Sequence, residues 1–139
     1  MTTATEAFRW TAKYAVNIAA LDNQHRNLFG MINQLSEALG NGEGATILDP
    51  ILQRLLEYAS THFAAEEGLM TKYNFPGAGK HEAEHAAFKN QVGQFLEDHE
   101  SGKAGVPVAL LFFLQSWLKE HILVTDKAYS TFLNARGVH

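Results

Sequence analysis

The sequence predicts an all-α protein, an up-down-up-down antiparallel four-helix bundle with an ordered N-terminal arm. Large apolar residues recur every three or four positions in four long segments, which is the period of an amphipathic α-helix. Three glycine-rich stretches separate these segments and are typical of loops. Helices joined by short loops pack as antiparallel neighbours, so the order along the chain predicts the bundle. With 139 residues, the chain is long enough for one such domain and too short for two.

The arm comes first, because residues 1–18 lack helical period but carry large apolar side chains. Those side chains are Phe8, Trp10, Tyr14 and Ile18. We expect the arm to pack on the bundle, which residues 19–139 form as a single domain. Its four helices are expected over residues 19–39, 46–73, 80–99 and 107–133.

Each helix is justified by its apolar stripe and its end signals. The start of the second helix is ambiguous: Asp49 and Pro50 are typical of an N-cap and first turn, yet Leu48 already fits the stripe. Pro107 suits the first turn of the fourth helix, where its missing N–H costs nothing. In chain order, the stripes include Leu21, Leu28, Ile32 and Leu35, then Leu48, Leu52, Leu55 and Ala59, then Phe88, Val92 and Phe95, then Leu110, Phe113, Trp117 and Val124.

Composition argues against several classes of protein. The net charge is -4 and no basic run occurs, so we expect no nucleic-acid partner. The longest uninterrupted apolar run, residues 106–114, is far shorter than the roughly 18 residues that a membrane-spanning helix needs, so we expect no membrane insertion. The N-terminus shows no secretory signal, and a cytoplasmic location is expected. The absence of cysteine excludes disulfides and thiolate metal ligands.

Seven polar side chains lie on or beside the apolar stripes, where an unpaired imidazole or carboxylate is costly. They are His25, His62, Glu66, His81, His85, His121 and Asp126. The pairs His62/Glu66 and His81/His85 are four residues apart, which places both members on one helix face. In an antiparallel bundle, the start of the first and third helices lies level with the end of the second and fourth. All seven side chains can therefore meet in one layer of the core.

A layer of five imidazoles and two carboxylates favours a pair of metal ions. Seven ligands are too many for one tetrahedral zinc, and carboxylates can bridge two ions. Suppose that three histidines bind one iron and two bind the other, with Glu66, Asp126 and a solvent oxygen as bridges. One iron then has six ligands and the other five, and one position stays open to a small molecule.

Asp126 has the least regular spacing of the seven. It follows His121 by five residues, which is about 140° around an ideal α-helix. Asp126 instead continues a neighbouring stripe with Leu118 and Ile122. We therefore expect it to reach between two metals from that side, and we do not expect His121 and Asp126 to chelate one metal together.

Four short motifs surround the seven polar side chains. They are ALDNQH at 20–25, HFAAEE at 62–67, HEAEH at 81–85, and WLKEHI at 117–122 with Asp126 and Lys127 following. Together they resemble the hemerythrin family, most closely its single-domain bacterial form, over about residues 10–133. The resemblance implies that one iron is bound by His81, His85 and His121 and the other by His25 and His62. It implies two non-heme iron ions bridged by an oxo or hydroxo group, Glu66 and Asp126, with dioxygen binding reversibly at the five-coordinate iron.

An apolar pocket that excludes water and protons would support reversible oxygen binding. The candidates to line it are Phe63, Trp117, Leu118, Ile122 and Tyr129. Leu118 is expected over the oxygen site, because it lies three residues before His121 and one turn before Ile122. Imidazole N–H groups that do not face metal should find hydrogen-bond acceptors nearby. Three other groups, His99, His139 and Glu67, are expected to face solvent or a boundary and not to bind metal.

These observations favour a non-enzymatic oxygen carrier, which stores dioxygen or delivers it to an oxygen-consuming enzyme. One alternative is an enzyme that uses the same di-iron centre to reduce peroxide or nitric oxide. A second is an oxygen or redox sensor, although the chain has no room for a signalling domain. A third, storage of zinc or another metal, fits poorly with a site that has one open position.

Overall fold

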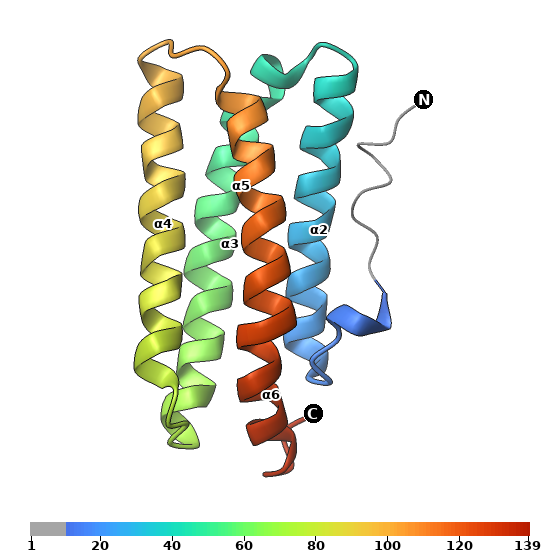
Figure 1. The fold of residues 1–139 in the computed structure, drawn as a ribbon, viewed down its shortest axis with the longest axis vertical. Coiled ribbons are helices and arrows are strands. Elements are labelled where there is room, and N and C mark those ends of the chain that lie inside the picture. Colours follow the sequence, from blue (N-terminus) through green and yellow to red (C-terminus); the bar gives the residue numbers. More distant parts are fainter. Residues whose placement is uncertain (1–10) are drawn as a thin grey trace.

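Four long helical columns stand side by side in the computed structural model, which describes residues 11–139 (Figure 1). In chain order the elements are η1 (Ala12–Tyr14), α2 (Ala19–Gly40), α3 (Gly44–Lys72), α4 (Ala78–Glu100), α5 (Val106–Glu120), η2 (His121–Asp126) and α6 (Lys127–Asn134). No strand occurs within residues 11–139. The predicted all-α four-helix bundle is therefore confirmed, and each predicted helix end lies within two residues of the observed one.

The columns form a ring in which consecutive helices run in opposite directions. α2 packs against α3 and α5, and α4 packs against the same two helices from the other side. The fourth column consists of α5, η2 and α6 in one continuous run (Figure 1). This topology places the beginning of α2 and α4 level with the end of α3 and of the fourth column.

A glycine in the left-handed conformation follows the ends of α2 and α4. Gly42 after α2 and Gly102 after α4 have φ of +74° and +81°, in the left-handed region where glycine meets no Cβ penalty. The uncertain start of α3 is settled by the structure: the helix begins at Gly44, and Pro50 lies inside it. The apolar stripe at Leu48, and not the Asp49–Pro50 signal, therefore marked the beginning of this helix.

The core consists of two apolar clusters with the seven polar side chains between them. The larger cluster includes Leu28, Ala59, Phe63, Leu118 and Ile122. The smaller cluster consists of Val16, Ile18, Leu21, Met70, Tyr129 and Leu133. His25 in α2, Glu66 in α3 and Asp126 in the fourth column fall between the two sets in sequence. His62 and His121 each stand one residue before the last member of the larger cluster in their column. The apolar core thus seals the polar layer from above and below.

Part of the predicted arm falls within the described residues. Tyr14, Val16 and Ile18 are buried against the bundle. The backbone N–H of Val16 donates to Asp22 Oδ1 at 2.8 Å, and Lys127 Nζ donates to the carbonyl of Ala15 at 2.6 Å. Phe8 and Trp10, the other apolar residues of the predicted arm, lie outside the described residues.

By length and mean hydropathy, the column Val106–Asn134 qualifies as a possible membrane span. No single apolar run in the column reaches this length, because polar residues are spread through it. A core helix of a soluble bundle passes the same test, so this single helix is weak evidence for a membrane span. Leu110, Leu114 and Leu118 of this column lie fully buried in the larger cluster.

Truncation of a core side chain tests the packing of the larger cluster. Leu55 is fully buried, and we expect Leu55→Ala to lower the free energy of unfolding by about 2–5 kcal/mol, because the variant leaves a cavity. The matched control is Phe112→Ala on the exposed face of α5, expected to change the free energy by no more than about 0.5 kcal/mol. Urea unfolding followed by circular dichroism measures both, and equal losses would contradict the assigned core.

Candidate metal centre

All seven predicted side chains meet in one buried layer of the bundle. α2 supplies His25, α3 supplies His62 and Glu66, α4 supplies His81 and His85, and η2 supplies His121 and Asp126. Each of the seven is at most 2% exposed. The seven side chains therefore lie where the antiparallel order of the helices predicted them, in one layer of the core.

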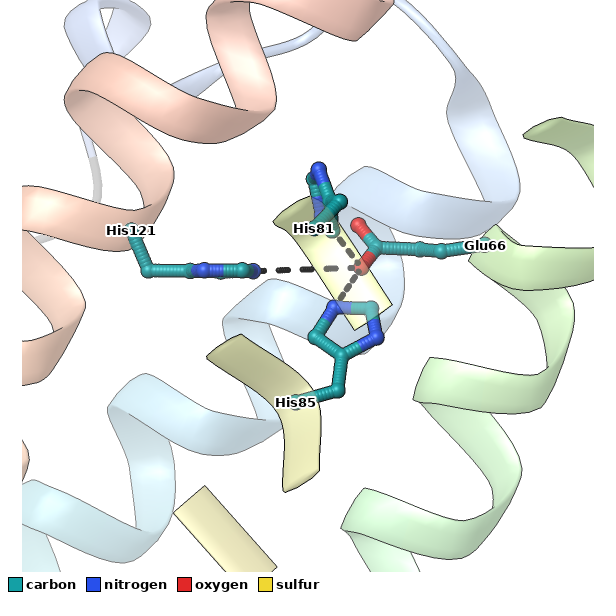
Figure 2. A group of neighbouring side chains, drawn as sticks. All are labelled: Glu66, His81, His85 and His121. Carbon is teal, nitrogen blue, oxygen red and sulfur yellow. Dashed lines mark ion pairs between the residues drawn. The ribbon is translucent and has the colours of Figure 1, made fainter. Parts of the chain in front are cut away.

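Three histidines converge on one oxygen of Glu66, as Figure 2 shows. Glu66 Oε1 lies 3.0 Å from His85 Nε2, 3.5 Å from His81 Nε2 and 3.9 Å from His121 Nε2. We call His81, His85 and His121 the three-histidine group. Their Nε2 atoms all turn toward the centre of the layer, which is the arrangement of nitrogen ligands around a cation.

The other oxygen of Glu66 faces the remaining two histidines. Glu66 Oε2 lies 3.4 Å from His62 Nε2 and 3.7 Å from His25 Nε2. These two Nε2 atoms are 3.0 Å apart. We call His25 and His62 the two-histidine group. Glu66 therefore has one oxygen on each group.

Asp126 divides its oxygens between the groups in the same way. Its Oδ1 lies 3.0 Å from His81 Nε2 and 3.1 Å from His121 Nε2, both in the three-histidine group. Its Oδ2 lies 3.1 Å from His25 Nε2, in the two-histidine group. Both carboxylates thus lie between the groups, with one oxygen directed at each.

The π-helical turn η2 explains how Asp126 reaches this position. A π-helix bonds residue i to residue i+5, so residues five apart come to lie above one another. His121 and Asp126 begin and end η2, and their side chains therefore point the same way. The expectation that they diverge by about 140° was wrong, because it assumed an unbroken α-helix. Asp126 approaches from the side of His121 and not from a separate stripe.

Three of the five imidazole nitrogens that face away from the centre have hydrogen-bond partners that the sequence did not name. His85 Nδ1 lies 2.8 Å from Glu67 Oε2, and His121 Nδ1 lies 3.1 Å from Glu84 Oε1. Glu67 is partly exposed, as expected for a solvated face, but the expectation did not include its contact with His85. Each glutamate is next to a candidate ligand in sequence. Its side chain lies at the contact between its own helix and the next column.

Gln24 plays the corresponding part for the two-histidine group, since its Oε1 lies 2.5 Å from His62 Nδ1. Tyr58, a further residue that sequence reasoning missed, stacks on the His62 ring with centroids 4.9 Å apart. Its position four residues before His62, on the same helix face, was the available signal.

Three of the five predicted pocket residues contact side chains of the layer. Phe63 stacks on His85 with ring centroids 3.8 Å apart, and Trp117 stacks on His121 at 4.2 Å. Tyr129 donates its hydroxyl to Glu66 Oε2 at 2.5 Å. The remaining two, Leu118 and Ile122, are fully buried in the larger apolar cluster.

Burial and charge act against one another in the metal-free layer. Burial opposes a positive charge on His25, but contacts with Asp126 and Glu66 outweigh it and raise the pKa of His25 to about 9. Burial is outweighed in the same way at His121, where Asp126 and Glu66 raise the pKa to about 10. For His62 burial prevails, and the pKa is lowered.

The two carboxyls stay ionised for the complementary reason. Burial alone would raise the pKa of Glu66 and Asp126, but the histidines around them hold both pKa values well below the usual range. Without a cation, protonated histidines and ionised carboxylates therefore balance the charge of the layer.

Comparison with known proteins decides the family. The model of the hemerythrin HHE cation binding domain matches residues 16–133.

The chain belongs to the hemerythrin family.

The chain matches two relatives over nearly their full lengths. The chain is 31% identical to a bacteriohemerythrin of Methylococcus capsulatus, over 91% of this chain and 96% of that protein. It is 32% identical to a hemerythrin-like protein of Naegleria gruberi, over 95% and 98% of the two chains. A crystal structure of wild-type hemerythrin superposes with a TM-score of 0.80 at 29% identity, covering 89% of this chain and 95% of that one.

The buried layer of this hemerythrin-family protein fits a bound cation, as expected for a cation binding domain. Six side-chain atoms that face its centre lack a hydrogen-bond partner among the described residues, although ion-pair distances of 3.0 to 3.9 Å join them to one another or to His25. They are Glu66 Oε1, His81 Nε2, His85 Nε2, His121 Nε2, Asp126 Oδ1 and Asp126 Oδ2. Buried polar atoms without partners are costly, and imidazole nitrogens with carboxylate oxygens are suitable ligands for iron.

The raised histidine pKa values predict how the stability of the metal-free protein depends on pH. A group whose pKa rises on folding stabilises the fold below its unfolded value of 6.5, and this gain disappears as the pH rises through the folded value. We therefore expect the melting temperature, measured in chelator, to fall between pH 6.5 and pH 10 as His25 and His121 lose their protons.

Replacement of a histidine outside the layer provides the control for this pH dependence. His99→Gln should show the same fall in melting temperature as the unmodified chain, because His99 lies near the far end of α4. A melting temperature that rises or stays constant over this range would contradict the charge balance assigned to the layer.

Proposed function

We propose that the protein reversibly binds dioxygen at a pair of iron ions held by the seven buried side chains. The observation that carries the proposal is the division of Glu66 and Asp126 between the two histidine groups. A carboxylate with one oxygen directed at each group suits a bridge between two cations. The unequal number of histidines leaves the ion of the two-histidine group with one protein ligand fewer, and hence a position for a small molecule.

The surroundings of the layer favour reversible binding over oxidative chemistry. The iron pair would supply the electrons that dioxygen binding takes up and returns. The chain contributes the exclusion of water, since Phe63, Leu118 and Ile122 are fully buried beside the layer. Five neutral imidazoles also supply less negative charge than the glutamate-rich centres of ferritin-like proteins, so higher oxidation states of iron are less favourable here.

Membership in the hemerythrin family supports iron as the metal and a carrier as the role. We therefore propose storage of dioxygen, or its delivery to an oxygen-consuming enzyme, without catalysis by this chain. An enzyme that reduces peroxide or nitric oxide, or a sensor, would use the same seven ligands. Measurements on the iron-loaded protein separate these roles.

Cycled exposure to oxygen tests the carrier proposal directly. We expect metal analysis to give two irons per chain, and the reduced protein to take up dioxygen and return it intact under vacuum over several cycles. Visible absorption follows uptake and release. Rapid irreversible oxidation, with turnover of peroxide or nitric oxide, would favour the enzyme, and a content of one metal ion or of zinc would refute the di-iron centre.

Leu118 is the pocket residue with the sharpest test. We expect Leu118→Tyr to speed autoxidation, because it brings a hydroxyl group into a fully buried apolar position three residues before His121. Leu118→Met serves as the control, since it keeps an apolar side chain of similar volume. The decay of the oxygen-bound absorption measures the rate, and equal rates in the three proteins would remove Leu118 from the oxygen site.

A further inference from the structure

The partners of the outward-facing imidazole nitrogens differ between the two histidine groups. In the three-histidine group, His85 and His121 each direct Nδ1 at a carboxylate, Glu67 at 2.8 Å and Glu84 at 3.1 Å. His81 Nδ1, in the same group, has no hydrogen-bond partner among the described residues. Two negative charges therefore adjoin the three-histidine group from outside.

On its outer side, the two-histidine group has only a neutral partner among the described residues. His62 Nδ1 meets the amide oxygen of Gln24, and His25 Nδ1 has no hydrogen-bond partner within the described part of the chain. When Nε2 binds a metal, Nδ1 keeps its proton and donates a hydrogen bond to the acceptor. A carboxylate acceptor raises the basicity of Nε2 and holds the ring in place, whereas a neutral amide does so less strongly.

Glu84 has a second contact that bears on the same group. Its Oε1 also accepts a hydrogen bond from the Thr125 hydroxyl at 2.9 Å. Thr125 immediately precedes Asp126 within the π-helical turn η2. One carboxylate oxygen therefore holds both the His121 ring and the turn that places Asp126 Oδ1 at 3.1 Å from His121 Nε2.

We propose that Glu67 and Glu84 are positioning residues that make the three-histidine group the stronger metal site, so that the first ion fills it and the second fills the two-histidine group. This order rests on the pair of metal sites in the proposed function. Three imidazoles in place of two act in the same direction. Each glutamate is about one third exposed, which leaves its charge partly screened by water.

The order of filling is measured on the metal-free protein with Zn²⁺, without any oxygen chemistry. We expect the first equivalent to shift the imidazole ¹⁵N resonances of His81, His85 and His121, and the second to shift those of His25 and His62. Simultaneous shifts of both sets, or earlier shifts of the second set, would overturn the proposal.

Variants identify the residues responsible for the order. We expect Glu67→Gln and Glu84→Gln each to weaken binding of the first ion by about 10- to 100-fold and to leave the second step almost unchanged. Gln24→Leu should weaken the second step alone, and Glu97→Gln, an exposed residue of α4 outside the layer, should change neither. Equal weakening of both steps by the two glutamate variants would refute their assigned role.

Thr125→Val separates the two actions of Glu84. The variant removes the hydroxyl that donates to Glu84 but keeps the contact between Glu84 and His121. Weaker binding of the first ion in this variant would therefore assign part of the effect to the π-helical turn η2. Circular dichroism of the metal-free variants verifies that each is folded.

Ordered uptake of two ions without reversible oxygen binding would refute the proposed function and leave this inference standing. Reversible oxygen binding with simultaneous filling would do the reverse.

Discussion

The burial of two carboxylates, Glu66 and Asp126, dictates how the surrounding helices pack. A carboxylate buried without a partner is costly, and five imidazoles gather around these two so that every oxygen faces a ring nitrogen. Apolar clusters close the layer on both sides, which keeps water from screening these interactions. The position of each helix is therefore tied to the polar layer as well as to the apolar core.

The same arrangement links metal uptake to protons and to geometry. The metal-free layer balances its charge with protons on His25 and His121, whose pKa values are raised. A cation that binds the Nε2 atoms must displace those protons, so metal affinity depends on pH. Outside the layer, Glu67, Glu84 and Gln24 hold the rings from behind, and the aromatic residues Phe63 and Trp117 lie flat against two of them.

Helix periodicity and loop composition predicted the four helices to within two residues at each end, because every helix buries one apolar stripe. The same periodicity, combined with antiparallel order, predicted that seven side chains share one layer. Glu67, Glu84 and Tyr58 were not predicted as neighbours of that layer. Whether a residue beside a ligand faces water or the seam between two helices depends on how those helices pack, and the pattern of a single helix does not contain this information.

Residue spacing and chain order were enough to predict the fold class, the level of the polar layer and the seven side chains that meet in it. How Asp126 enters the layer could not be predicted in this way, since the widened π-helical turn seen in the folded chain departs from the regular α-helical period. Tertiary packing also decides which carboxylate oxygen faces which histidine group and which acceptor each outer imidazole nitrogen receives. These depend on distances between different helices, which the spacing within one helix does not determine.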